Sequence, residues 1–341
     1  MELWTKRLAA MTSDYRRIDV PGVRSLCWAG DDLVDWVGGG TVIRGDGTVE
    51  GPYVRYAYRF DAVETSPCGG FAVIYERRGT KGLVLGNGKV LREINRSFYH
   101  AGAYEYPIAI FRNRSGQTVL AHCPREYCQL ELEDIETGET CGHAKDRDPT
   151  DFFHSRLRVS KDGKWLLSAG WVWHPWGCLA LFDIEEALRD ASTLDRSLMT
   201  PDIDGEVSAA AFLPDNRIVI ATSDDSLDGD EADADSIGPN TLAVFDPQNR
   251  HVSSLCGIDA PVGRLMAVDE STVVGFYEHP KLYSLGTGEV LQEWEEIDSG
   301  NQLSSIIVSD DVRIPPIACD SANGRFAVAS ESAVFVVTVR T

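Results

Sequence analysis

The sequence predicts an all-β fold, and two repeating patterns of short strands support that prediction. The first pattern is a tight turn between two short apolar strands, which recurs every 38 to 54 residues along the 341-residue chain. These turns lie at Asp31, Gly69, Gly116, Asp162, Asp215, Asp269 and Asn323. After each of the first six turns come two more strands, joined by a turn that contains Gly or Asp. Four short strands in every ~40–50 residues are typical of a propeller blade, so we predict a seven-bladed β-propeller.

The clearest copy of the repeat runs from Val159 to Asp183. Its first turn, at 161–164, has the Asp-Gly sequence of a hairpin. Trp165 to Ala169 then forms a buried strand, and Gly177 to Phe182 forms a third apolar strand. Three strands of this length cannot bury both of their faces alone, so the unit needs neighbouring copies of itself.

The whole chain, 1–341, is expected to form one domain. Its blades are predicted at about 22–60, 61–100, 105–145, 152–200, 205–258, 260–298 and 313–341. The last blade supplies only three strands before the chain stops, and propellers close their ring with a strand from the other terminus. We therefore predict that Tyr15–Val20 is the outermost strand of the last blade, after an N-terminal segment at 1–14. The alternative is an unpaired N-terminal tail.

These repeats resemble a degenerate WD-repeat or YVTN-type seven-bladed propeller, of the kind common in bacterial proteins. The resemblance covers roughly residues 15–341 and rests on the Asp/Gly turns and on an apolar-x-apolar-Asp ending, seen at 181–183 and 244–246. No blade carries the Gly-His and Trp-Asp pair of the standard repeat. The resemblance implies the fold and no particular function.

Charge and cysteine content restrict the partners and the compartment that we expect. The net charge of −21, from 32 basic and 53 acidic residues, repels phosphate, so neither nucleic acid nor an anionic membrane is an expected partner. Most of the 8 cysteines lie in or beside apolar strands, and no apolar stretch approaches membrane-spanning length. We expect a cytoplasmic, reduced protein that is monomeric on its own and needs no cofactor.

Two weak metal-binding patterns are present. Zinc ligands could come from Cys123, Cys128, Cys141 and His143, with His122 beside them, but this spacing matches no known zinc motif, and core thiols are the preferred interpretation. Calcium ligands could come from Asp224, Ser226, Asp228 and Asp235, although the twelfth position of this loop is Asp and no helices flank it. A mobile acidic loop is the preferred interpretation there.

The loops that join the second and third strands of the blades should all emerge on one face, which we predict to be the binding face. Its candidate binding residues come from a basic loop, an aromatic loop at 171–176 and an acidic loop at 223–240. They are Arg77, Arg78, Trp171, Trp173, His174, Trp176, Asp224, Asp225 and Asp228. At least one of the three tryptophans should be exposed, beside the acidic loop, because strand alternation sends adjacent positions to opposite sides. The alternative is that all three fill the space between blades.

Two classes of function remain open. The preferred one is a non-catalytic scaffold that binds a protein partner through this face, because Trp is enriched at the centres of interfaces. The other is a propeller enzyme, such as a lactonase-like hydrolase, with its site at the mouth of the channel. An enzyme would need histidines and carboxylates to converge there, and the candidate histidines are His122, His154, His174 and His279. No G-x-S-x-G motif is present.

Overall fold

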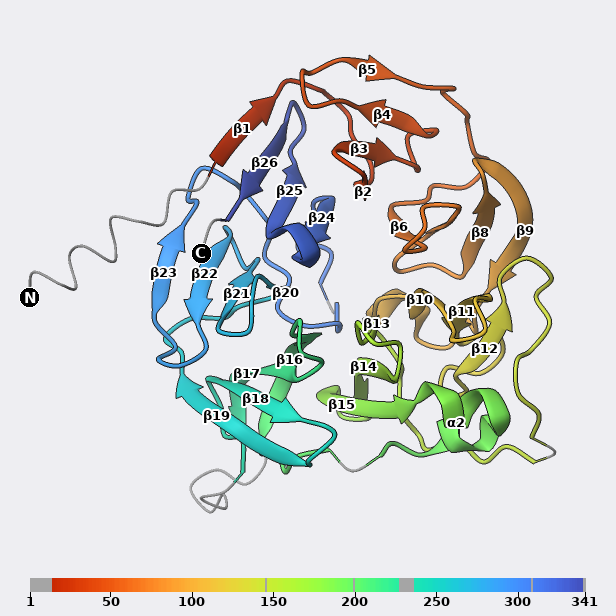
Figure 1. The fold of residues 1–341 in the computed structure, drawn as a ribbon, viewed down its shortest axis with the longest axis vertical. Helices are drawn as coiled ribbons and strands as arrows, with labels where there is room; N and C mark the ends of the chain where they lie inside the picture. The colour runs from red at the N-terminus through yellow and green to blue at the C-terminus, as the bar shows by residue number, and fades with distance from the viewer. Residues whose placement is uncertain (1–13, 145, 199, 227–235, 308, 340–341) are drawn as a thin grey trace, which may run out of the picture.

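The computed structural model describes residues 14–144, 146–198, 200–226, 236–307 and 309–339. In this part of the chain, seven antiparallel sheets stand around a central channel, as Figure 1 shows. The all-β fold and the seven-bladed propeller are confirmed. Among the described residues, no helix is long and apolar enough to cross a membrane.

The strands follow one another within each blade from the channel outward. The first blade comprises β2 (Cys27–Ala29), β3 (Asp32–Asp35), β4 (Thr41–Ile43) and β5 (Val49–Glu50). The second comprises β6 (Ala62–Thr65), β7 (Phe71–Tyr75), β8 (Lys81–Gly86) and β9 (Lys89–Asn95). The third comprises β10 (Ile108–Arg112), β11 (Thr118–His122) and β12 (Glu131–Asp134). The fourth comprises β13 (Leu157–Val159), β14 (Trp165–Val172) and β15 (Trp176–Asp183).

The remaining blades continue the same order. The fifth comprises β16 (Gly205–Phe212), β17 (Ile218–Ser226), β18 (Thr241–Asp246) and β19 (His251–Gly257). The sixth comprises β20 (Leu265–Ala267), β21 (Thr272–Gly275), β22 (Lys281–Ser284) and β23 (Val290–Glu293). The seventh comprises β24 (Ile317–Asp320), β25 (Arg325–Ala329), β26 (Val334–Thr338) and β1 (Asp14–Ile18). Short helices are α2 (Ile184–Arg189), η1 (Ala101–Ala103), η2 (Ala191–Asp195) and η4 (Ser321–Asn323).

The ring closes through β1, which pairs antiparallel with β26 as the outer strand of the seventh blade (Figure 1). The register runs from Asp14 opposite Thr338 to Ile18 opposite Val334. The predicted closing strand is therefore confirmed, although the paired segment ends at Ile18 and not at Val20. This pairing covers the backbone edge that β26 would otherwise expose.

The core is divided into layers that lie between successive blades. Leu166 packs with the third blade, whereas its neighbour Leu167 packs with the fifth blade. Strand alternation explains this division, because consecutive side chains point to opposite faces of a sheet. Both faces are covered, so β14 is buried along nearly its whole length. This arrangement explains why the strands of the chain are almost continuously apolar.

The third and fourth blades depart from the predicted four-strand pattern, because each has three strands in the described part of the chain. In the fourth blade a helix takes the place of the last strand. After β15 the chain forms α2, whose first turn is capped by the Asp183 carboxylate accepting a hydrogen bond from the Glu186 N–H at 3.1 Å. Asp at this position is a favoured helix N-cap because it satisfies a free amide of the first turn. Asp183 is thus both the last residue of β15 and the N-cap of α2.

Candidate functional site: a charged channel and an aromatic surface

Antiparallel order gives the ring two different faces. One face, the short-turn face, carries the turns between first and second strands, such as 160–164 and 213–217. The other, the long-loop face, carries the loops between second and third strands and the links between blades. Function in such scaffolds usually resides on loops. The channel is narrow near the long-loop face and wide near the short-turn face.

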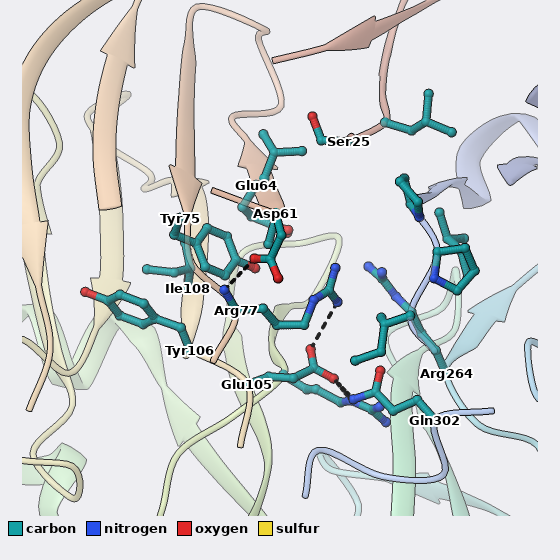
Figure 2. A pocket seen from close by; sticks show the side chains of 18 of the residues that line it. Ser25, Asp61, Glu64, Tyr75, Arg77, Glu105, Tyr106, Ile108, Arg264 and Gln302 are labelled. Atoms are coloured by element: carbon teal, nitrogen blue, oxygen red, sulfur yellow. Dashed lines mark hydrogen bonds and ion pairs between the residues drawn. The ribbon is translucent and has the colours of Figure 1, made fainter. Parts of the chain in front are cut away.

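A small chamber of about 70 Å³ lies in the channel near the long-loop face, and Figure 2 shows its lining. Glu105, from the link before β10, is at its centre. The Arg156 Nε donates a hydrogen bond to the Glu105 carboxylate at 2.9 Å, and the Arg77 guanidinium lies 3.8 Å from that carboxylate. Burial raises the pKa of the Glu105 carboxyl, but Arg156 and Arg77 outweigh burial and bring the pKa down to about 2. Glu105 is therefore ionised and ties two blades together.

A strap, residues 299–307, crosses the chamber on this face. It leaves the sixth blade where the Glu278 N–H donates to the Gly300 carbonyl at 2.6 Å. It reaches the link before the third blade, where the Ile307 N–H donates to the Ala103 carbonyl at 2.7 Å. The Gln302 amide donates to the Glu105 carboxylate on the way. The strap therefore closes the chamber toward the long-loop face.

The channel widens toward the short-turn face into an open cavity of about 1160 Å³. Glu64 on β6, Arg158 on β13 and Arg264 just before β20 line both this cavity and the chamber. Arg158 Nη1 lies 3.7 Å from the Glu64 carboxylate. Inner strands therefore place charged groups where chamber and open cavity meet.

An aromatic surface lies on the long-loop face between the second, third and fourth blades. Its buried base is formed by Tyr104, Phe153 and Trp171, each 1% exposed. Its outer layer, which we call the aromatic surface, consists of Tyr99, His100, Tyr127 and Trp173, and the exposed Phe98 precedes Tyr99 in the chain. Phe98 is 86% exposed, Trp173 48% and Tyr99 41%.

The rings of the two layers are packed against one another. Tyr127 stacks on Phe153 with centroids 4.2 Å apart, and the edge of His100 meets Trp173 at 4.8 Å. Aromatic pairs at these distances add stability beyond the area that they bury. The outer rings are therefore held in place by the base while one side of them stays in solvent.

The residues of the aromatic loop at 171–176 differ in their exposure to solvent. Trp171 is buried in the base, Trp176 is half-buried, and Trp173 and His174 are exposed. The expectation that at least one indole is exposed is confirmed by Trp173, whereas its position beside the acidic loop stays a prediction. The rings that contact Trp173 are His100, from the link before the third blade, Phe153, from the link before the fourth blade, and Trp171 on β14.

The basic loop, residues 76–82, contacts other parts of the chain. Arg77 points into the chamber and its side chain is only 13% exposed. Arg78 donates to the Gly102 carbonyl at 2.7 Å and lies 3.1 Å from the Asp310 carboxylate. Both guanidiniums therefore have partners within the chain, and their role in binding a partner stays a prediction.

The acidic loop is described only at its ends. Asp224 and Asp225 are exposed at the end of β17, and the Ser226 hydroxyl donates to the Asp204 carboxylate at 2.6 Å. Asp228 and Asp235 lie outside the described residues. The calcium interpretation therefore stays a prediction.

The arrangement of the residues named in the zinc interpretation does not support a zinc site, and the absence of zinc stays a prediction. No group of three or more His, Cys, Asp and Glu side chains among the described residues could hold a metal ion. Cys141 hydrogen bonds through its N–H to Leu132 on the outer edge of β12, while Cys123 continues β11 on the inner side of β12. Strands are ~4.8 Å apart, so two strand spacings separate these residues. All eight cysteines, each within the described residues, are free.

The four candidate histidines do not converge in the channel. His122 Nε2 lies 3.1 Å from the Glu133 carboxylate on the third blade, and His279 Nε2 lies 2.9 Å from Glu293 on the sixth. His154 is buried, and burial lowers its pKa to about 4. In the part of the chain that the structure describes, no histidine lines the chamber or the open cavity.

Sequence reasoning missed Glu64, Glu105, Arg156, Arg158 and Arg264. A signal for some of them exists, because inner strands line a propeller channel and should be apolar or small unless they serve the channel. Glu64 and Arg158 sit within such strands. Glu105 lies in a link and carries no comparable signal.

The seven sheets around a channel define the class of the protein as a seven-bladed β-propeller. Several solved structures are similar to this chain. BamB from Moraxella catarrhalis matches with a TM-score of 0.54 and 14% identity, covering 96% of this chain and 98% of that one. The Cps50 (Swd1) propeller domain of Myceliophteria thermophila matches with a TM-score of 0.57 and 13% identity, covering 96% of this chain and 100% of that one. A chain of the Mitotic Checkpoint Complex matches with a TM-score of 0.57 and 12% identity, covering 96% of this chain and 95% of that one.

These likenesses concern the fold alone. No protein-family model matches the chain, and no curated protein matches it.

Proposed function

We propose that this protein is a non-catalytic protein-interaction scaffold and that the aromatic surface binds its partner. The observation that carries the proposal is the exposure of Tyr99 and Trp173 over a packed aromatic base, with the exposed Phe98 next to Tyr99 in the chain. Exposed contiguous aromatic rings are uncommon on monomers, and Trp and Tyr dominate the binding energy of interfaces. A fixed base also reduces the entropy lost on binding.

The partner that suits this surface is a basic protein segment that carries arginine. The net charge of −21 attracts positively charged partners over long range. Exposed indole and phenol rings bind guanidinium groups through cation–π contacts. Asp151, whose carboxylate accepts a hydrogen bond from the Tyr127 hydroxyl at 2.7 Å, adds an exposed carboxylate at the rim.

Similar propellers support the scaffold class in general, because one of them was solved as part of the Mitotic Checkpoint Complex. The basic and acidic loops are not needed for the proposal, since Arg77 and Arg78 are already paired. We do not propose the hydrolase, because no described histidine lines the channel.

The cellular setting is a separate part of this proposal. The free state of all eight cysteines supports a reducing, cytoplasmic location. The assignment of the repeats to a WD or YVTN type, and their bacterial origin, stay predictions.

The test is quantitative capture of partners from an extract of the source organism. Three baits are compared: the wild type, a double variant with Phe98→Ala and Trp173→Ala, and a matched control with Leu255→Ala and Val290→Ala, which are exposed on β19 and β23. We expect a defined protein that the wild type and the control retain and that the double variant loses by about tenfold or more. Equal recovery of every captured protein by all three baits would contradict the proposal.

A further inference from the structure

Among the described residues, one guanidinium of the channel has neither a hydrogen bond nor an ion pair. Arg264 lies before β20 and lines both the chamber and the open cavity. Among the described residues its guanidinium makes no hydrogen bond and no ion pair, although the residue is largely enclosed by the channel. Its pKa is raised even though burial opposes that shift, because Cys319, Glu64 and Glu105 surround it at longer range.

The nearby carboxylates are already engaged by other groups. Glu105 accepts from Arg156 and from Gln302. Glu64 lies 3.7 Å from Arg158. Asp61 accepts a hydrogen bond from the backbone N–H of Arg77 at 2.7 Å. Each of these carboxylates thus has another partner, and among the described residues none of them forms an ion pair with Arg264.

A count of the chamber lining leads to the same result. Its basic residues are Arg77, Arg156, Arg158 and Arg264. Its acidic residues are Asp61, Glu64 and Glu105. One positive charge is thus in excess inside a protein whose overall charge is strongly negative. A charge taken out of water without compensation is destabilised, so an anion entering this chamber would be stabilised.

We propose that the central channel is a binding site for a carboxylic acid, whose carboxylate is held by Arg264, and that Arg77, which lies 3.8 Å from the Glu105 carboxylate, faces this site across the chamber. Figure 2 shows these two side chains pointing toward one another across the chamber. A guanidinium presents two parallel N–H groups that match the two oxygens of a carboxylate. One singly charged group balances the single excess charge, whereas a phosphate dianion would be repelled by Glu64 and Glu105.

The sizes of the two spaces fit this ligand. The chamber of about 70 Å³ exceeds the ~10–15 Å³ that one water molecule requires, so it holds a group of a few atoms. The strap closes the chamber on the long-loop face, so the carboxylate enters from the short-turn face. The rest of the ligand occupies the open cavity of about 1160 Å³.

The probes are sodium acetate, succinate and benzoate, each compared with phosphate and with chloride at equal ionic strength. Binding is measured by isothermal titration and by thermal melting of the full-length protein, at probe concentrations up to about 100 mM. Arg264→Gln removes the free guanidinium. Arg217→Gln is the control, because Arg217 lines neither the chamber nor the open cavity and pairs with Asp215.

We expect at least one of the three carboxylates to bind the wild type and the control, and Arg264→Gln to weaken that binding about tenfold or more. If Arg264→Gln fails to fold, Arg264→Lys serves instead, since a single ammonium cannot form the paired contact. The proposal is overturned if none of the carboxylates binds the wild type, if phosphate or chloride binds at least as tightly as every carboxylate, or if the Arg264 variant binds as the wild type does.

Discussion

Trp171 stacks on Phe153 with ring centroids 3.8 Å apart and planes inclined by 11°, and the two residues also exchange both of their backbone hydrogen bonds. The link before the fourth blade is thereby fixed to the end of β14. Trp173 follows two positions later and carries its indole out of this packed base into solvent. The local backbone pairing thus determines where the exposed ring lies.

Gly170→Ala tests whether this pairing supports the aromatic surface. A Cβ at Gly170 would overlap the carbonyl oxygen of Phe153 and would lie 2.6 Å from the Phe152 ring. We expect the substitution to lower the free energy of unfolding by about 1–3 kcal/mol, as overpacking does. Gly102→Ala is the control, because a Cβ there meets no atom within 4 Å. Equal denaturant midpoints for the two variants would show that the Phe153–Trp171 contact tolerates displacement.

Glu105→Gln tests the ion pairs of the chamber. The substitution leaves Arg156 and Arg77 without their shared carboxylate in a partly dehydrated site, so we expect a loss of about 3 kcal/mol in the free energy of unfolding at pH 7. Urea unfolding measures this loss. Asp19→Asn, at an exposed pair with Arg17, should change stability much less.

The same residue predicts a dependence on pH. The pKa of Glu105 is about 2 in the folded protein, below the ~4.3 of an unfolded glutamate, so the stability that it contributes is present above that unfolded value. That contribution is lost as the pH falls from about 4.3 toward 2. The difference between wild type and Glu105→Gln should therefore shrink over this interval. A difference that stays constant down to pH 2 would show that Glu105 does not carry its charge in the folded state.

Removal of residues 1–20 tests the closure of the ring. The deletion takes away β1 and exposes the edge of β26, so we expect a lower melting temperature and the appearance of oligomers on size exclusion. Arg17→Ala, which changes an exposed side chain of β1 and keeps its backbone, is the control. An unchanged melting curve together with a monodisperse deletion protein would show that β1 is dispensable.

The fold is predictable from the sequence because each blade repeats its own local signals. A tight turn needs Gly or Asp, as at Asp162 and Gly163, and a blade covered on both faces needs apolar runs such as 165–169. The closing strand is predictable for a different reason: a last blade with three strands leaves an edge that must be covered.

The channel is not predictable in this way, because its contacts join residues that are far apart in the chain. Glu105 meets Arg156 51 positions later and Gln302 197 positions later. The sequence around each of these three residues contains no pattern that predicts its contact with the other two. The aromatic surface is an intermediate case, since the loop at 171–176 points to it, whereas Tyr99 and Tyr127 join it only through the packing of blades.

The affinity of the captured partner for Trp173→Ala tests the central claim, that the aromatic surface binds a protein, most directly. We predict a loss of about 2 kcal/mol or more, equivalent to roughly 30-fold weaker binding by isothermal titration, with a melting temperature close to that of the wild type. Leu255→Ala, equally exposed at 48% on β19, should bind as the wild type does. Unchanged affinity of a folded Trp173→Ala protein would contradict the account.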